Sequence, residues 1–374
     1  MSVLRLPSVL ALSALLPAAV FAQASRSGVR PRVSPVETLP QPAVPLDPLE
    51  LVTGDAQPVQ TAEQRLAATN LVENARALSN VRAHAYDLKT TFTSSGGDWN
   101  LEDISPSHRA YRWTAQGPSY AAVNLHVDKL FYTNEPAGPV PLRLAQVRSA
   151  IFFAYRRTGP RATLRTFTSN LNGAEVSCVL VSHGSQAKAA AGGRRWEESE
   201  SCIDPKTGLL MTYSPAPGMF VRYDYTNAIR FHDKVIAGKF TITEAGQTIV
   251  EARTESVTDP ANLDPALFEP AGLTQVGVGP VSGMPWYVRS SVIGGAPNAN
   301  STIHAVVLHG LLSPDGALSE TEVVASTNAS LNQSALDKAA EWKNWQADNN
   351  EVEPGATPQW HEVFFVVKLL APVP

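Results

Sequence analysis

The chain has 374 residues, of which 44% are hydrophobic and 17% are charged, and its formal net charge is -4. This is the composition of an ordinary globular protein. No basic stripe stands out, so the charge pattern gives no electrostatic reason to expect nucleic acid as a partner. Beyond the N-terminal segment, no window approaches the roughly eighteen consecutive apolar residues of a membrane-spanning helix.

The first 24 residues have the order of a secretory signal peptide. Arg5 precedes an apolar run over residues 9–21, and Ala22-Gln23-Ala24 supplies small residues with the spacing of a cleavage site. Cleavage after Ala22 and cleavage after Ala24 fit the pattern equally well. We therefore expect export across the inner membrane to the periplasm, or a membrane anchor if the leader is not cleaved.

Residues 25–60 are rich in proline and hold few aromatic side chains. A segment of this composition cannot bury enough apolar area to offset the entropy that ordering removes. We predict a disordered tether between the leader and the first folded domain.

A first folded domain is predicted over residues 61–270. It opens with a helix that ends near Asn80, because Thr61 and Gln64 have the spacing of a capping box. An apolar stripe follows on the same helix, made of Ala67, Leu71, Ala75 and Leu78.

From Tyr86 onward the hydrophobic period changes from that of a helix to that of a strand. Alternation recurs over residues 123–127 and 221–225, and turn signals rich in Gly, Pro and Asn separate these runs. One more helix is predicted after Pro141, with one face made of Leu144, Val147, Ile151 and Tyr155. The domain is therefore expected to be a large antiparallel sheet with few helices.

Cys178 and Cys202 are the two cysteines of the chain. In an oxidising compartment they predict one disulfide, with two buried free thiols as the alternative. The disulfide would close a loop of about 25 residues and stabilise the fold by roughly 3 to 4 kcal/mol in the chain-entropy account. A reactive thiol is not expected, because no Cys-x-x-Cys is present.

The turn after the second cysteine carries a family resemblance. Cys202-Ile203-Asp204-Pro205-Lys206-Thr207-Gly208-Leu209 places an Asp-x-x-Thr-Gly turn directly after a strand. With this turn, the opening helix and the strands around Tyr86 and Tyr223, residues 61–270 resemble the LolA/LolB-like lipoprotein carriers. The resemblance implies an unclosed barrel whose concave side holds acyl chains, and hence an apolar ligand.

Residues 271–302 are rich in Gly, Pro, Ser and Asn and are predicted to be a linker. An apolar strand over residues 305–312 then runs into a turn at which Asp315 and Gly316 favour a tight reversal. The sequence therefore predicts a hairpin that ends near Val324.

A helix and a last strand follow this hairpin. Ser330 and Gln333 have capping-box spacing, and the helix face consists of Leu331, Ala335, Ala339 and Trp342. The last strand shows the two-residue period, with Val363, Phe365 and Val367 on one face. The expected fold class is α+β, with a small strand-strand-helix-strand C-terminal domain over residues 303–370 beside the large sheet.

This element order resembles the C-terminal domain of the TonB family. The resemblance rests on Asp315-Gly316 at the turn, residues 331–336 at the helix start and Trp345 near the helix end. It implies that the segment binds envelope proteins by strand addition, which needs an exposed sheet edge. We expect that edge on the last strand, at Val363, Phe365 and Val367.

Three functions stay open on the sequence. The first is a non-catalytic periplasmic envelope protein that binds partners by strand addition and an apolar ligand in its middle domain. The second is an energy transducer for outer-membrane transport, anchored by an uncleaved leader, with outer-membrane receptors as partners. The third is a periplasmic carrier of lipid or lipoprotein.

No motif for catalysis, cofactor binding or metal binding stands out. The histidines form no His-x-x-x-His pair, and there is no Gly-x-Ser-x-Gly, phosphate loop or Gly-x-Gly-x-x-Gly. Asp98, Glu102, Asp103 and His108 cluster in sequence and are interpreted as solvated loop charges, and a structural role is expected for His309. We therefore expect no enzyme, no cofactor and no metal.

Overall fold

The computed structural model describes residues 56–107, 109–134, 140–183, 194–196, 198–260, 263–276, 285–293, 301–313, 316–341 and 360–372. The chain divides into the units Met1–Ser34 and Pro35–Pro374, and every described residue belongs to the second. The predicted signal peptide and the tether as far as residue 55 lie outside the described residues, as do Trp342 and Trp345. Among the described helices, none has both the length and the apolarity to cross a membrane.

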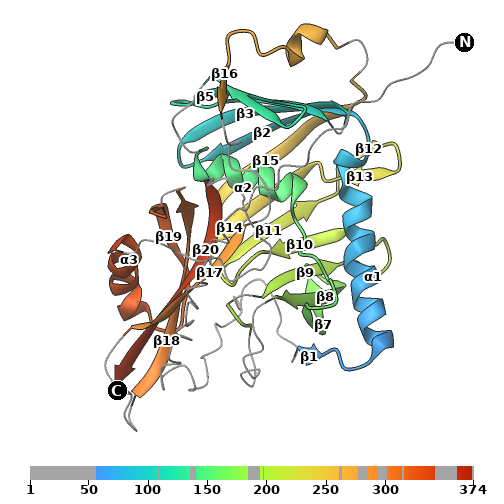
Figure 1. Ribbon diagram of the computed structural model, residues 1–374. Helices are drawn as coiled ribbons and strands as arrows, with labels where there is room; N and C mark the ends of the chain where they lie inside the picture. The colour runs from blue at the N-terminus through green and yellow to red at the C-terminus, as the bar shows by residue number, and fades with distance from the viewer. Residues whose placement is uncertain are drawn as a thin grey trace, which may run out of the picture. The chain divides into compact units, whose positions relative to one another are not determined.

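A large sheet of fourteen strands forms the body of this unit, and every neighbouring pair in it is antiparallel (Figure 1). Its order begins at β1 and ends at β16, so the described sheet is open, as the sequence predicts. In sheet order the strands are β1 (Gln57–Pro58), β7 (Thr163–Leu171), β8 (Ala174–Ser182), β9 (Ser199–Ile203), β10 (Leu210–Ser214), β11 (Met219–Asp224), β14 (Lys239–Glu244), β15 (Gln247–Thr258), β2 (Tyr86–Ser94), β3 (Gly97–Ser107), β4 (Ala110–Gln116), β5 (Ala121–Val127), β6 (Leu130–Thr133) and β16 (Thr274–Val276).

Helix α1 (Ala62–Ser79) begins where the sequence predicts. Thr61 caps it, and Gln64 completes the capping box. Its buried face consists of Ala68, Val72 and Ala75, whereas Ala67 of the predicted stripe is exposed. The two stripes are neighbours on the helix surface, and only the position of the sheet decides which of them is covered. The 3₁₀ turn η2 (Val81–Ala83) follows.

Helix α2 (Leu142–Phe152) is buried on almost every side. Eight of its eleven residues are buried, including the polar Gln146 and Arg148. It contacts β15 of the large sheet and β20 of a second, smaller sheet. A helix covered on two opposite faces has no solvent side on which to place its polar residues, so Gln146 and Arg148 must find partners in the interior.

Two strands, β12 (Ile229–Phe231) and β13 (Lys234–Ile236), form a hairpin that is a sheet of its own. Its turn places His232 at φ 53°. The hairpin lies beside α1, which β13 contacts (Figure 1).

The small sheet has the order β17-β20-β18-β19. The hairpin of β18 (Ser301–Leu312) and β19 (Leu318–Ser326), helix α3 (Asn332–Glu341) and strand β20 (His361–Pro372) confirm the predicted element order. Gly316 has φ 83° in the turn, as a tight reversal requires, while Asp315 lies outside the described residues.

Parts of the segments expected to lack structure form strands. β1 lies near the end of the predicted tether and pairs with β7. β16 lies in the predicted linker and pairs with β6. β17 (Trp286–Ile293) also comes from that linker and pairs with β20 in parallel. Two parallel neighbouring strands are joined by a long crossover connection and not by a tight turn. No turn signal in the sequence therefore predicts their pairing. The domain boundaries over residues 61–270 and 303–370 stay predictions.

The start of α3 also differs from the sequence prediction. A short 3₁₀ turn, η4 (Ala329–Leu331), precedes the helix, and Asn328 caps it by accepting from the Ser330 N–H at 3.1 Å. The Ser330 hydroxyl donates to the same Asn328 oxygen at 2.8 Å. It is therefore engaged outside the predicted capping box with Gln333.

The predicted partner-binding edge is wrong. Strand β20 is an inner strand, because β17 pairs with one of its sides and β18 with the other. Val363, Phe365 and Val367 are each 1% exposed and pack with Ala335 and Ala339 of α3. The backbone groups that strand addition needs are already paired there. The edge strands of this sheet are β17 and β19.

The opposite face of the small sheet shares one core with the large sheet. Val307, Phe364 and Val366 belong to the same buried cluster as residues of α2, β11 and β14. The Tyr287 hydroxyl donates to the Pro215 carbonyl at 2.7 Å. Gly218, at φ 85°, lies so close to β19 that a Cβ there would be 1.8 Å from the Val324 oxygen.

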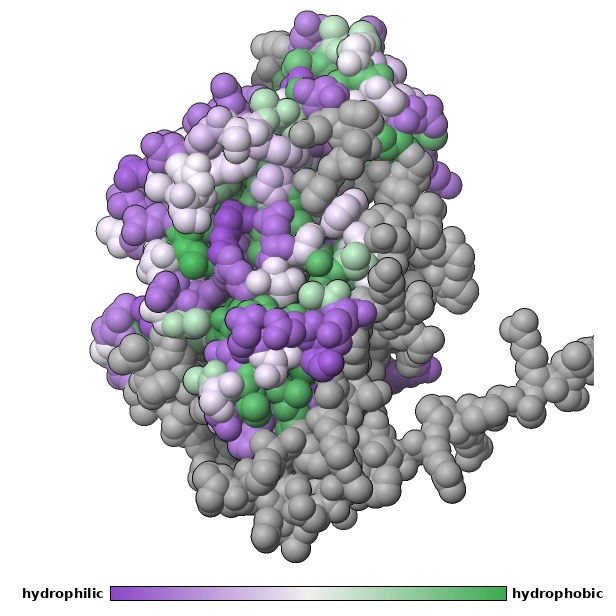
Figure 2. Space-filling model, turned by 90° about the vertical axis from the view of Figure 1, so that its left-hand side faces the viewer, coloured by the Kyte–Doolittle hydropathy of each residue, from purple (hydrophilic) through white to green (hydrophobic). Residues whose placement is uncertain are grey.

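The outer side of the small sheet is covered by α3. Figure 2 views the molecule from the side of β19 and α3, and its described part is mostly hydrophilic with small hydrophobic groups between. Lys338 and Glu341 form an exposed pair on this helix at 2.8 Å. The helix therefore turns Ala335 and Ala339 inward and these charges toward solvent.

Candidate ligand-binding cleft

An apolar cleft lies where α1 and α2 end against the face of the large sheet. Its walls come from the end of α1 with η2, from the end of α2, from β2, β11, β14 and β15, and from β13 of the hairpin. Its volume is about 50 Å³. An engineered apolar cavity of about 150 Å³ is large enough for benzene, so the cleft is small in this conformation.

The polar atoms of three cleft-lining side chains are turned to backbone carbonyls. The Tyr223 hydroxyl donates to Ala150 at 2.7 Å, the Tyr225 hydroxyl to Leu210 at 3.0 Å, and the Thr254 hydroxyl to Ala237 at 2.9 Å. Burial raises the pKa of both tyrosines, so the phenols stay neutral. These residues therefore present carbon surface to the cleft.

One cation stands at the cleft, and it is already paired. Arg76, in the last turn of α1, donates from Nε to Glu73 at 2.8 Å, and its guanidinium lies 4.8 Å from the centre of the Tyr155 ring. A cation at a helix C-terminus also interacts favourably with the negative end of the helix dipole. Because the charge of Arg76 is balanced by these neighbours, we expect the cleft to favour an apolar ligand over a charged one.

A second centre, a buried charged network, joins the small sheet to α2 and the large sheet. His309 of β18 is fully buried, with Nδ1 2.6 Å from Glu244 and Nε2 3.0 Å from Glu362. Its ring stacks on Phe364 with centroids 4.5 Å apart. Helix α2 completes the network, because Gln146 donates to Glu244 at 2.6 Å and Ser149 to Glu362 at 2.7 Å.

The charged groups of this network stabilise one another's ionised forms. Burial alone would lower the pKa of His309, but Glu244 and Glu362 outweigh it and raise the pKa to about 9. Burial alone would raise the pKa of Glu244, but His309 and Arg143 outweigh it and keep that pKa below its usual range. The imidazolium therefore lies between carboxylates in a dry site, which suits a structural role and not proton transfer to a substrate.

Stability is expected to depend on pH through His309. The folded-state pKa of about 9 lies above the unfolded value of about 6.5, so the stabilisation is complete below pH 6.5 and is lost as the pH rises through 9. Between pH 6.5 and pH 8 the loss should be about 2 kcal/mol. Urea denaturation at the two pH values measures it, and the variant His309→Leu, Glu244→Gln, Glu362→Gln, which removes the cation together with both carboxylates, should lose this slope. Equal slopes in the two proteins would contradict the expectation.

The acidic cluster predicted from the sequence lies on a strand instead of a loop. Asp98, Glu102 and Asp103 belong to β3. Asp103 is buried and pairs with Arg148 of α2, whose guanidinium lies 4.5 Å from the centre of the Trp113 ring. Burial raises the pKa of Asp103 more than Arg148 lowers it. His108 lies outside the described residues.

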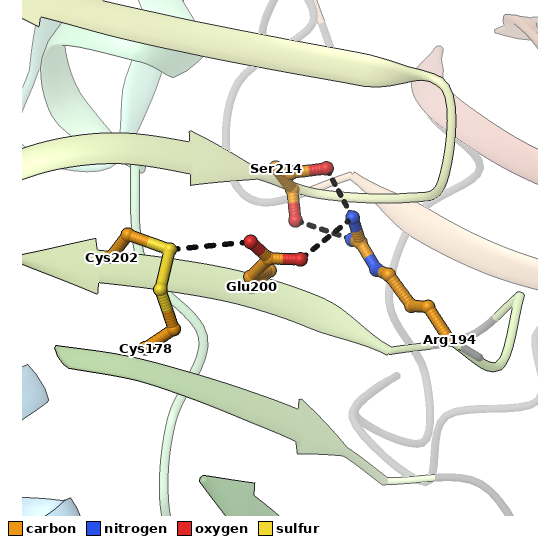
Figure 3. Close-up of a disulfide and its surroundings, with 5 residues drawn as sticks. All are labelled: Cys178, Arg194, Glu200, Cys202 and Ser214. Atoms are coloured by element: carbon orange, nitrogen blue, oxygen red, sulfur yellow. Dashed lines mark hydrogen bonds and ion pairs between the residues drawn. A yellow bond between two sulfur atoms is a disulfide. The ribbon is translucent and has the colours of Figure 1, made fainter. Parts of the chain in front are cut away.

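The predicted disulfide is present and crosses two neighbouring strands (Figure 3). Cys178 of β8 and Cys202 of β9 face each other in register, with Cα atoms 4.1 Å apart. The Glu200 side chain lies beside the disulfide, and the guanidinium of Arg194 lies near the Glu200 carboxylate. The same guanidinium donates to the Ser214 hydroxyl at 2.5 Å. These two cysteines and Glu200 are close enough together to resemble a metal site, but sulfurs joined in a disulfide cannot act as thiolate ligands.

The sequence alone did not assemble the cleft or the network. In the sequence, Tyr223 and Tyr225 stand out only as members of an alternating strand, and no pattern marks Glu244. In the chain, Glu244 lies 65 residues before its partner His309, and Glu362 lies 53 residues after it. A local pattern carries no information about such partners.

No protein-family model and no curated protein match this chain. Solved structures similar to it include a LolA superfamily protein from Nitrosomonas europaea, with 8% identity and a TM-score of 0.36 over 54% of this chain and 97% of that one. MucB is another, with 13% identity and a TM-score of 0.28 over 64% and 70% of the two chains. The complex of MucA and MucB from Pseudomonas aeruginosa gives 13% identity and a TM-score of 0.27 over 63% and 69%. At these values none of these structures assigns a function to this chain.

Proposed function

We propose that this protein binds an apolar ligand, or the apolar part of a larger one, in the cleft between α1, α2 and the large sheet. It acts as a non-catalytic binding or carrier protein. The observation that carries the proposal is the cleft lining, in which the polar atoms of Tyr223, Tyr225 and Thr254 are engaged with backbone carbonyls. An apolar surface reachable from solvent is a default site for a ligand of the same kind.

Export to the periplasm is part of this proposal and is supported by the leader pattern of residues 1–24. An apolar ligand cannot cross an aqueous compartment at useful concentration without a protein that covers it. The binding of envelope proteins at a sheet edge, and the energy-transducer function, stay predictions from the sequence. For the first of them, β20 no longer supplies the edge.

Filling the cleft is expected to remove binding. Ala154 is half-buried and lines the cleft, and Ala154→Trp would place an indole in a volume of about 50 Å³. The affinity for N-phenyl-1-naphthylamine, an uncharged apolar probe that fluoresces in dry surroundings, should fall at least about tenfold. Fluorescence titration of the purified protein measures this.

A matched variant separates blocking from a general effect of the new side chain. Ala77→Trp makes the same change at an exposed position of α1 outside the cleft, and the probe should bind it as it binds the unmodified protein. If the unmodified protein bound no probe, or if Ala154→Trp bound it unchanged, the proposed function would be wrong.

A further inference from the structure

The cleft is too small for a ligand unless one of its walls moves, and one wall differs from the others. Ile236 and Ala237 line the cleft at the end of the β12–β13 hairpin. Within the described part of the chain, this hairpin pairs with no strand of the fourteen-stranded sheet. Moving residues 229–236 would therefore break no hydrogen bond between strands of the large sheet. Ala237, whose carbonyl accepts from Thr254, and Gly238, which is bonded to Asp224 and Thr254, stay in place.

The apolar side chains of the hairpin pack into a buried cluster that borders the cleft. Phe231 is buried in a cluster with Tyr86 and Val257, and Ile229 and Ile236 pack against the same cluster. Four further members of that cluster or its border also line the cleft, namely Val81, Leu88, Ile151 and Phe152. Lifting the hairpin would withdraw its own side chains from this cluster and extend the cleft over the apolar residues that they cover.

The tip of the hairpin is fastened by contacts that are exposed to solvent. His84 Nε2 lies 2.7 Å from Asp233 Oδ1, and His232 Nε2 lies 2.7 Å from Asp259 Oδ1. The rings of His84 and His232 stack with centroids 4.4 Å apart, and Lys234 pairs with Asp233 within the hairpin at 2.6 Å. The two histidine–aspartate pairs are exposed to solvent, and such pairs contribute little each, so they hold the tip weakly and reversibly.

Resting on the proposed function, we propose that the β12–β13 hairpin is the gate of the cleft, held shut by the contacts of His84 with Asp233 and of His232 with Asp259. The ligand enters when both contacts break and the hairpin, with Phe231, swings away from Tyr86 and Val257. The apolar ligand then covers the surface that the hairpin leaves.

The test removes one partner of each contact and leaves the turn itself unchanged. In the double variant His84→Ala, Asp259→Ala, the amides of β12 and β13 should exchange hydrogen about five- to tenfold faster than in the unmodified protein, because the open state is more populated. The association rate of N-phenyl-1-naphthylamine should rise by a similar factor. Exchange in β2 and β3 should not change.

A control variant weakens an exposed contact elsewhere on the large sheet. Asp98→Asn alters the bond that Asp98 accepts from the Thr93 hydroxyl at 2.7 Å, and both rates should stay at the values of the unmodified protein. Unchanged exchange in the double variant, or faster exchange with an unchanged association rate, would overturn the gate alone. An unmodified protein that binds no probe would overturn the proposed function together with the gate.

Discussion

Replacing His309 by alanine is expected to lower the free energy of unfolding by about 3 to 5 kcal/mol. The variant would leave Glu244 and Glu362, with side chains 3% and 2% exposed, without the cation between them. Two carboxylates in a dry interior must then be neutralised, hydrated or moved, and each outcome destabilises the junction of the two sheets. Urea denaturation followed by circular dichroism measures the loss.

A control on the same strand tests whether the effect belongs to the network. His304→Ala changes the same residue type at a half-buried position of β18, and the expected loss is below about 1 kcal/mol. Adding Glu362→Gln to His309→Ala should recover part of the stability, because among the described residues His309 is the cation that pairs with Glu362. A loss from His309→Ala as small as that from His304→Ala would show that the network does not stabilise the fold.

Removing the disulfide is expected to lower the free energy of unfolding by about 3 to 4 kcal/mol. The double variant Cys178→Ala, Cys202→Ala opens the covalent loop between positions separated by 24 in sequence, and the unfolded chain gains the entropy that the loop withheld. The two sulfurs also pack with Phe167, Leu180 and Phe220, so some burial is lost as well. Urea denaturation under oxidising conditions measures the difference.

The same measurement with a thiol reductant provides the comparison. The reductant opens the disulfide of the unfolded unmodified chain, so the stabilities of the two proteins should approach each other. If they differed equally with and without reductant, the loss would come from packing around the sulfurs and not from the covalent loop. The apolar probe should bind the double variant as tightly as the unmodified protein, because neither cysteine lines the cleft.

The shared core changes how the C-terminal segment is understood. Its element order is the one that the sequence predicts, but one face packs on α3 and the other completes the interior of the large sheet. His309 and Glu362 come from this segment, and they meet Glu244 and the polar residues of α2. In the folded protein the segment therefore contributes to the body that carries the cleft.

Several predictions are confirmed because they depend only on interactions between residues that are close in sequence. The capping box of Thr61 and Gln64, the helix after Pro141 and the glycine at position 316 each depend on neighbours a few residues away. The period of two along β2 likewise indicates a strand without reference to its partners. These are the signals that a sequence holds by itself.

The sequence by itself indicated the three α-helices, the antiparallel character of the large sheet and the order of the C-terminal elements, and it predicted one disulfide between Cys178 and Cys202. Only the tertiary structure decided that Ala68 and not Ala67 faces the sheet, that β20 is an inner strand, and that His309 lies between two carboxylates. The cleft belongs to the second group, because its walls come from segments that span residues 76 to 254. Caps, turns and periods follow from interactions between near neighbours, whereas covered faces, free edges and sites follow from segments that meet only when the whole chain folds.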